Sequence, residues 1–362
     1  MNDGGAYALE VAACRKQFAD FARQTSKGTP LYSRIAAGVA ADPDLAALLT
    51  IAPEQQRLPV LLLACVHSLV LGEPDSELAS FYPNLAGRGV VVGDPVPAFR
   101  AFCKSHRDQL GHLLSTRHTQ TNEIGRTALF LPCFGELERE VGPLAHIDVG
   151  ASAGLNLLLP RYDFVYEPGG VVATGSVVRL TCGTRGPVPV PQRHPTVAAA
   201  VGIDPSPIDV RDPDQARWLE ACVWPDQVER FERLSAAIGL ARDLGVDVSR
   251  GDAVADIARV VGEQATHGHP VVTTSWVMNY LTADERRSFV AELDRIGSTA
   301  DVSFVYAESP GLCPELPGIP PARATDQPTA LVIVRWRGGR RLVAHVADAH
   351  PHGAWIHWVP GR

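Results

Sequence analysis

Along the first 140 residues, apolar side chains recur every three or four positions. This spacing places them on one face of a helix. Prolines separate the helical segments, and no stretch alternates convincingly between apolar and polar residues as a half-exposed strand does. The helical spacing is seen at Phe18, Phe21 and Ala22, at Ile35, Val39, Leu45, Leu48 and Leu49, and at Phe102, Leu110, Leu113 and Leu114. The pattern predicts a helical N-terminal domain over residues 1–140.

From residue 141 the pattern changes to short apolar runs separated by helical stretches, which is typical of strands joined by helices. One helical stretch, residues 214–240, is expected to be split by Pro225. Another opens with Thr282 and Glu285, the spacing of a capping box. The predicted strands are residues 144–148, 199–204, 245–252, 269–275 and 301–308. We therefore expect a doubly wound parallel sheet in a second domain, 141–362, with ligands at the carboxyl ends of its strands.

Two further features modify this sheet. Gly338 and Gly339 lie between two apolar runs, 331–336 and 342–347, and Gly-Gly is a strong signal for a β-hairpin. Residues 161–198 form an insertion with one apparent strand, at 177–181. The sheet is therefore predicted to end in an antiparallel pair.

The chain is organised around the segment Asp148-Val-Gly-Ala-Ser-Ala-Gly154. It follows a buried strand and precedes an apolar stretch, so it predicts a tight turn into a helix. The first N–H groups of such a helix could seat a carboxylate or phosphate. Glycine at 150 and 154 would let a ligand approach the backbone. The alternative is an ordinary strand-to-helix turn without a ligand.

A second unusual segment, residues 117–126, is almost wholly polar and directly precedes an apolar run. It fits a helix N-terminus in which Thr121 or Asn122 caps and Glu123 complements the helix dipole. It equally fits a polar lid that offers Gln120, Glu123 and Arg126 to a small ligand. Both interpretations stay open.

Composition narrows the class of function. The formal net charge of −7 argues weakly against a nucleic-acid-binding surface. The seven scattered cysteines, the lack of an apolar leader near the N-terminus and the short apolar run at 58–71 favour a cytoplasmic protein without a membrane span. No lysine follows Lys104, which excludes a Schiff base or a P-loop lysine from the second half. His350 and His352 are interpreted as part of a turn, and no metal site is expected.

The segment at 148–154 resembles motif I of the class I S-adenosylmethionine-dependent methyltransferases, with Ser152 in place of the usual middle glycine. Residues 201–207 resemble the second-strand motif of that family, and Gly251-Asp252-Ala253 its third-strand acid. Residues 271–289 resemble its fourth strand and following helix. The resemblance implies an α/β, Rossmann-like class I methyltransferase fold: a seven-stranded sheet with a terminal antiparallel hairpin, plus the N-terminal helical domain.

More narrowly, nearly the whole chain resembles the DUF2332 family, a resemblance that implies no reaction. The residues that carry it are 120–126, 150–157, Arg217-Trp-Leu219, Val223-Trp-Pro225 and His352-Gly-Ala-Trp355.

The methyltransferase resemblance implies S-adenosylmethionine as cofactor and a small-molecule methyl acceptor covered by the helical domain. It implies that Asp148 meets the methionine amino group, Asp204 the ribose and Asp252 the adenine amine. The other cofactor-binding candidates are Gly150, Ser152, Gly154, Asn156, Ser275 and Trp276. The catalytic candidates are Glu123, Arg126, Asn279 and Tyr280, and the substrate candidates are Gln120, Thr121, Asn122 and Glu308.

Several alternatives accompany this hypothesis. Each of the three strand-end acids could simply cap a helix or anchor a loop, and Trp276 or Tyr280 could be a core residue. The chain could also be a binding or regulatory protein of methyltransferase fold that has lost catalysis. A nicotinamide-dependent oxidoreductase is disfavoured, because Ser152 and Leu155 replace glycines of the dinucleotide motif.

Overall fold

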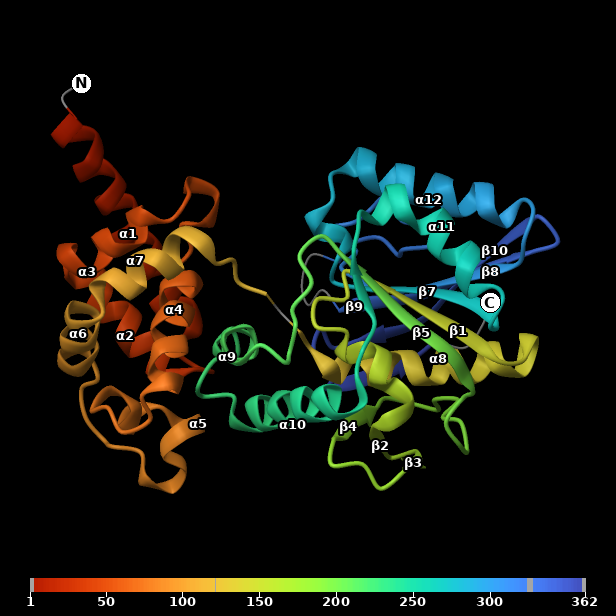
Figure 1. The fold of residues 1–362 in the computed structure, drawn as a ribbon, viewed down its shortest axis with the longest axis horizontal. Helices are drawn as coiled ribbons and strands as arrows, with labels where there is room; N and C mark the ends of the chain where they lie inside the picture. Colours follow the sequence, from red (N-terminus) through yellow and green to blue (C-terminus); the bar gives the residue numbers. More distant parts are fainter. Residues whose placement is uncertain (1–2, 121, 324–327, 360–362) are drawn as a thin grey trace. The chain divides into compact units, whose positions relative to one another are not determined.

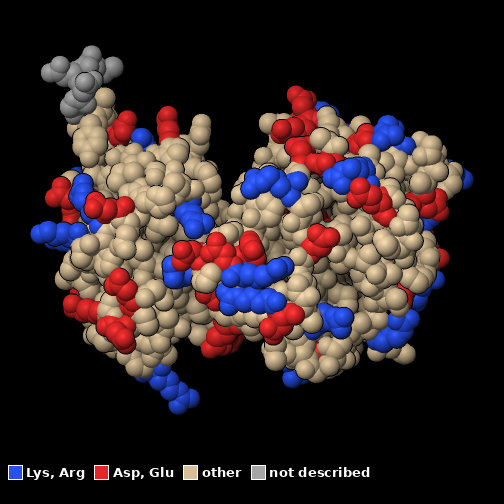
Figure 2. Space-filling model, viewed as in Figure 1, with Lys and Arg blue, Asp and Glu red and all other residues tan. Residues whose placement is uncertain are grey.

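A computed structural model describes residues 3–120, 122–323 and 328–359. The chain forms two compact units (Figure 1). The helical unit comprises residues 1–121 and 211–235, and the sheet unit comprises 122–210 and 236–362. The sequence pattern changes at residue 141 from helical to alternating strands and helices. The chain, however, passes from one unit to the other after residues 121, 210 and 235. On the face drawn in Figure 2, acidic and basic side chains are interspersed.

The helical unit packs around α4 (Pro59–Gly72), which is buried on nearly all sides. A helix that is apolar all round belongs in a core, which accounts for the apolar run at 58–71. Trp218 of α9 joins this core and donates from its indole nitrogen to the carbonyl of His118 at 3.0 Å. The other α-helices of the unit are α1 (Asp3–Thr25), α2 (Pro30–Ala41), α3 (Pro43–Ala47), α5 (Pro83–Ala86), α6 (Val96–Ser105), α7 (Arg107–Thr116) and α9 (Pro213–Ala221).

The helical stretch at 214–240 is divided, as its proline predicts. Helix α9 ends at Ala221, and six residues separate it from α10 (Val228–Leu244). Pro225 lies in the connection. The first part of α10 is assigned to the helical unit and the rest to the sheet unit.

The sheet unit contains one mixed sheet in the order β3-β2-β4-β11-β10-β9-β8-β7-β1-β5-β6. Its five parallel neighbours are β6 (Val248–Arg250), β5 (Val197–Asp204), β1 (Leu144–Val149), β7 (His269–Ser275) and β8 (Val302–Glu308). Helices α11 (Ala253–Gln264) and α12 (Ala283–Gly297) lie along one face and α8 (Thr127–Val141) along the other (Figure 1). Coverage on both faces explains why β1 and β8 are buried at every residue.

The expected sheet of seven strands was too small, because the described residues form eleven. The insertion supplies three strands rather than one: β2 (Asp163–Glu167), β3 (Gly170–Val172) and β4 (Arg179–Thr184). The C-terminal segment supplies β11 (Trp355–Trp358), which pairs with both β10 and β4. β11 thereby joins the insertion to the rest of the sheet.

The predicted hairpin is confirmed by β9 (Thr329–Arg337) and β10 (Arg340–Ala349). Gly338 and Gly339, between them, both have positive φ, at 54° and 77°. A two-residue turn with positive φ at both positions matches the twist of the strands it joins.

The order of the parallel strands reverses direction between β1 and β7. From β1 the chain adds β5 and then β6 on one side, and it then crosses to β7 on the other. In open α/β sheets the crevice at such a switch point is the usual place for a ligand. The carboxyl ends of β1 and β7 are therefore the first place to look for a site.

Candidate functional site

A chain of buried hydrogen bonds crosses the switch point. The Thr273 hydroxyl on β7 donates to Oδ1 of Asp148 on β1 at 2.7 Å. The same hydroxyl lies 2.8 Å from Nε2 of His146. Because the hydroxyl proton goes to Asp148, Nε2 must be the donor in the second bond. Asn156 completes the chain by donating to Oδ2 of Asp148 at 3.2 Å.

Two buried carboxyl groups occupy the strand ends. Burial raises the pKa of Asp148 to about 6, against the bonds from Thr273 and Asn156, which lower it. Burial also raises the pKa of Glu308, the last residue of β8, to about 7. Glu308 Oε1 accepts from the backbone N–H of Val277 at 3.0 Å. Both groups therefore change charge close to neutral pH.

Arg126 supplies a buried positive charge to this region. It ends η5 (Ile124–Arg126), and its charge lowers the pKa of both Asp148 and Glu308. Its Nη1 donates to the carbonyl of Ser275 at 2.9 Å, and its Nε to the carbonyl of Pro351 at 2.8 Å. The guanidinium also lies 5.8 Å from the centre of the Trp276 ring. Arg126 thus joins the end of β7 to the C-terminal turn.

Glu123 caps η5 and contacts the same turn. Its Oε1 accepts from the backbone N–H of Gly125 at 3.0 Å, and its Oε2 lies 3.4 Å from Nδ1 of His352. Capping was expected from Thr121 or Asn122 instead. Thr121 lies outside the described residues, and Asn122 Nδ2 is buried without a hydrogen-bond partner among those described.

The turn at 148–154 is held mainly by the protein itself. The N–H groups of Gly150 and Ala151 donate to the carbonyl of Ile203, and that of Gly154 to Ala151. The expected α-helix after the turn is instead η6 (Leu155–Arg161), a seven-residue 3-10 helix. The turn therefore does lead into a helix, as predicted, but the helix is of the 3-10 type.

The glycines of the turn make room for valines. A Cβ on residue 150 would stand 2.5 Å from Cγ2 of Val277, and one on residue 154 would stand 2.6 Å from Cγ2 of Val248. Their φ values of 73° and 69° are also disfavoured for other residues. Close packing inside the sheet unit is therefore sufficient to require glycine at both positions, and the predicted approach of a ligand to this turn stays a prediction.

We expect Gly150→Ala to destabilise the sheet unit by about 2 kcal/mol, because the new methyl group overlaps Val277 in a tightly packed site. Urea unfolding with hydrogen exchange of β1 peptides would measure this. Adding Val277→Ala should recover only part of the loss, since the positive φ remains. Full recovery would show that backbone conformation contributes nothing.

Two of the predicted strand-end acids hold local structure. Asp204 accepts from the backbone N–H of Ser152 at 2.8 Å and of Ser206 at 2.7 Å. Asp252 is exposed and is the N-cap of α11, accepting from Val254 and Ala255. Each oxygen still has a lone pair for a further donor.

The remaining candidate residues do not all lie in the same part of the molecule. Tyr280 is 75% exposed and is no core residue. Gln120 belongs to the helical unit. Trp276 has a positive φ of 57°, and its indole nitrogen donates to the Thr329 hydroxyl. The structure gathers Glu123, Arg126, Asp148, Asn156, Ser275, Trp276 and Glu308 in one region, and pattern analysis missed His146, Thr273 and Thr274 there.

Several buried polar atoms of the sheet unit have no hydrogen-bond partner among the described residues. Acceptors in this state include Oδ1 of Asn156, Oδ1 of Asn279 and Oε2 of Glu308. The Thr274 hydroxyl is also without one, yet it lies close enough to Glu308 to lower the pKa of that carboxyl. Buried polar groups are normally bonded, so such a concentration calls for water or a ligand.

A comparison with protein families matches residues 15–358 to DUF2332, described as "Uncharacterized protein conserved in bacteria". The chain belongs to the DUF2332 family. No curated protein and no solved structure matches it.

In this DUF2332 protein, the part of the chain that the structure describes holds no group of three metal-binding side chains and no helix able to cross a membrane. All seven cysteines are free.

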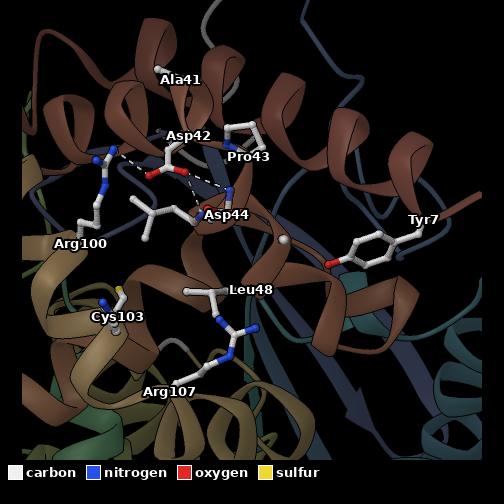
Figure 3. Close-up of a pocket in the computed structure, with 12 residues that line it drawn as sticks. Tyr7, Ala41, Asp42, Pro43, Asp44, Leu48, Arg100, Cys103 and Arg107 are labelled. Atoms are coloured by element: carbon white, nitrogen blue, oxygen red, sulfur yellow. Dashed lines mark hydrogen bonds and ion pairs between the residues drawn. The ribbon is translucent and has the colours of Figure 1, made fainter. Parts of the chain in front are cut away.

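The helical unit has a hollow of about 720 Å³ at the start of α3 (Figure 3). Asp42 accepts there from the backbone N–H groups of Asp44 and Leu45, and it pairs with Arg100 at 2.7 Å. Tyr7 and Arg107 enter the hollow from α1 and α7. The Asp42 carboxylate in this hollow therefore already serves as the N-cap of α3.

Asp42→Ala should cost about 1 kcal/mol, the usual effect of losing an N-cap. The backbone amides of Asp44 and Leu45 would then exchange faster with solvent. Asp44→Ala is the matched control, because Asp44 is exposed and supplies no cap. Equal exchange in both variants would contradict the capping role.

Proposed function

We propose that this DUF2332 protein is an S-adenosylmethionine-dependent methyltransferase acting on a small molecule. Its five parallel strands would then form the core of a Rossmann-like class I methyltransferase sheet, extended by the insertion and by β11. The observation that carries the proposal is the buried polar cluster at the β1–β7 switch point, where Asp148 accepts hydrogen bonds from both Thr273 and Asn156.

The chemistry of the cluster fits the methionine part of the cofactor. That part carries a positive sulfonium, an ammonium and a carboxylate. Oδ1 of Asn156 and Oε2 of Glu308 are buried acceptors without partners among the described residues, and the carboxyl group of Asp148 contacts Asn156. Acceptors and carboxylates stabilise cations, and a guanidinium such as that of Arg126 pairs well with a carboxylate.

Asp204 and Asp252 would hold the ribose and the adenine amine through lone pairs that their backbone bonds leave free. The bound cofactor would supply an already activated methyl group. The protein then has to align the acceptor and exclude water. Glu308, with its pKa raised to about 7, is suited to take the proton that a hydroxyl or ammonium acceptor loses.

The test is the thermal unfolding midpoint with S-adenosylmethionine, S-adenosylhomocysteine or NAD. A ligand at 100 times its dissociation constant adds about 2.7 kcal/mol, or roughly 2–4 °C for a chain of this size. We expect a shift with the two adenosyl ligands, and its loss in Asp148→Asn. Asp247→Asn is the matched control, since Asp247 is exposed in the same unit.

The outcomes separate the alternatives. A shift with NAD alone would favour an oxidoreductase. Binding of both adenosyl ligands without methylation of any acceptor in a methyl-transfer assay would favour a regulatory protein. No shift with any ligand would remove the proposal. The free cysteines support a cytoplasmic location for the activity.

A further inference from the structure

The helical unit contains a second, smaller pocket, of about 200 Å³. Its walls come from α2, α4, the segment after α7 and the residues around the end of α9. Tyr32 and Trp224 form its aromatic side, with ring centres 5.9 Å apart. Val60 and Ala64 of α4 form the aliphatic side. Every lining residue that the structure describes belongs to the helical unit.

The size of the pocket limits the occupant to about one ring. A dry apolar cavity of about 150 Å³ accepts benzene. A pocket of about 200 Å³ therefore holds a six-membered ring with one small substituent, and a fused pair of rings would extend beyond its walls.

The walls determine the chemistry of that ring. None of the described lining residues carries a formal charge, and burial raises the pKa of the Cys222 thiol to about 11, so it stays neutral. An ionised ligand would lose its hydration without gaining a partner. Aromatic walls favour an aromatic ring through offset or edge-to-face packing.

A few polar groups remain for a substituent. The indole N–H of Trp224 and the hydroxyl of Thr119 make no hydrogen bond among the described residues. The Tyr32 hydroxyl, by contrast, donates to the carbonyl of Leu63 at 3.4 Å. A pocket that is mainly apolar with a few polar groups is the usual form of a small-molecule site.

We propose that the helical unit binds a neutral, single-ring aromatic molecule bearing an oxygen substituent, in the pocket between Tyr32, Ala64 and Trp224. Phenols are the simplest members of this class. The inference uses the helical unit alone and stands whether or not the chain transfers methyl groups.

The test uses the full chain labelled with fluorotryptophan and p-cresol as the probe, followed by fluorine NMR. The six tryptophans give separate reporters, and Trp224→Phe assigns the one in the pocket. We expect a saturable shift of the Trp224 resonance. The saturated analogue methylcyclohexanol, the charged benzoate and the two-ring naphthol should each bind at least about tenfold more weakly.

Ala64→Leu fills the pocket and should weaken p-cresol binding by about tenfold or more. Ala40→Leu makes the same change at a half-buried position of α2 that does not line the pocket, and binding should be unchanged. If Ala64→Leu does not fold, Val60→Phe narrows the pocket from a half-buried position. Shifts that do not saturate, that spread over several tryptophans or that persist in the filled variants would overturn the inference.

Discussion

Replacing Arg126 with methionine is expected to destabilise the sheet unit by about 3–5 kcal/mol, the usual effect of breaking a buried charge pair. Methionine keeps the apolar stem but loses the bonds to the carbonyls of Ser275 and Pro351. It also removes the positive charge that lowers the pKa of Asp148 and Glu308. Hydrogen exchange of β1 and β8 peptides in urea would measure the loss in this unit separately.

The loss should depend on pH. Without Arg126 the carboxyl groups of Asp148 and Glu308 become harder to ionise. The variant therefore loses most stability above pH 7, where both groups are charged in the wild type. Arg341→Met is the matched control, because Arg341 forms an exposed pair with Asp294 in the same unit. Exposed pairs contribute only about 0–1 kcal/mol. Equal effects of the two substitutions would mean that Arg126 carries no special electrostatic role.

Local patterns predicted the central elements well. The apolar run at 269–275 coincides with β7, and the capping box at Thr282 and Glu285 opens α12. Both depend on residues close together in sequence. β3 and β11 were missed, because each is only three or four residues long. β11 also depends on pairing with β4, which lies far from it in sequence. The insertion therefore resembled a loop with one strand.

The site was predicted in part for a similar reason. Strand-end residues converge in any parallel sheet, so Asp148, Ser275 and Glu308 could be anticipated together. The bonds among His146, Thr273 and Asp148 depend on the register of β1 against β7, which pairs Asp148 with Thr273. No local pattern encodes that register. Asp252 conforms to its simpler interpretation, a helix cap.

Two helices, α8 and α9, belong to a different unit from the one that the sequence pattern predicts. Helix α8 is grouped with the sheet, against which it packs, although it continues the helical pattern of the N-terminal part. Trp218, from a helix between two strands in sequence, is buried in the helical unit. Helical periodicity identifies a buried face but leaves its partner undetermined.

Asp148→Asn is expected to stabilise the protein increasingly as the pH rises from about 4 to above 7. The pKa of Asp148 is raised to about 6 from an ordinary value of 3.8, mainly by burial. The stability from such a group is fully present below its unfolded pKa and is lost as pH rises through the folded one. The difference between these two pKa values of Asp148 corresponds to about 3 kcal/mol of lost stability at pH values above the raised pKa. Asparagine never ionises, so it avoids that loss.

The substitution can keep the hydrogen bonds. The new carbonyl can accept from Thr273, and the new amide can donate to Oδ1 of Asn156 if that side chain turns over. Glu308→Gln should behave likewise, in a window that runs from its ordinary pKa of 4.5 to about 7. Its amide can donate to the Thr274 hydroxyl, which has no partner among the described residues.

The measurement is the free energy of unfolding of the sheet unit at several pH values, with each variant compared to wild type. Asp247→Asn controls for the exposed case and should show no such trend. A constant difference across the window would contradict the raised pKa values. The proposed function adds a further expectation: the Asp148→Asn protein should be more stable at pH 8 yet fail to respond to the adenosyl ligands. A carboxyl group that destabilises the free protein and is needed for the ligand-induced shift is the pattern of a binding residue, because function commonly retains groups that stability alone would replace.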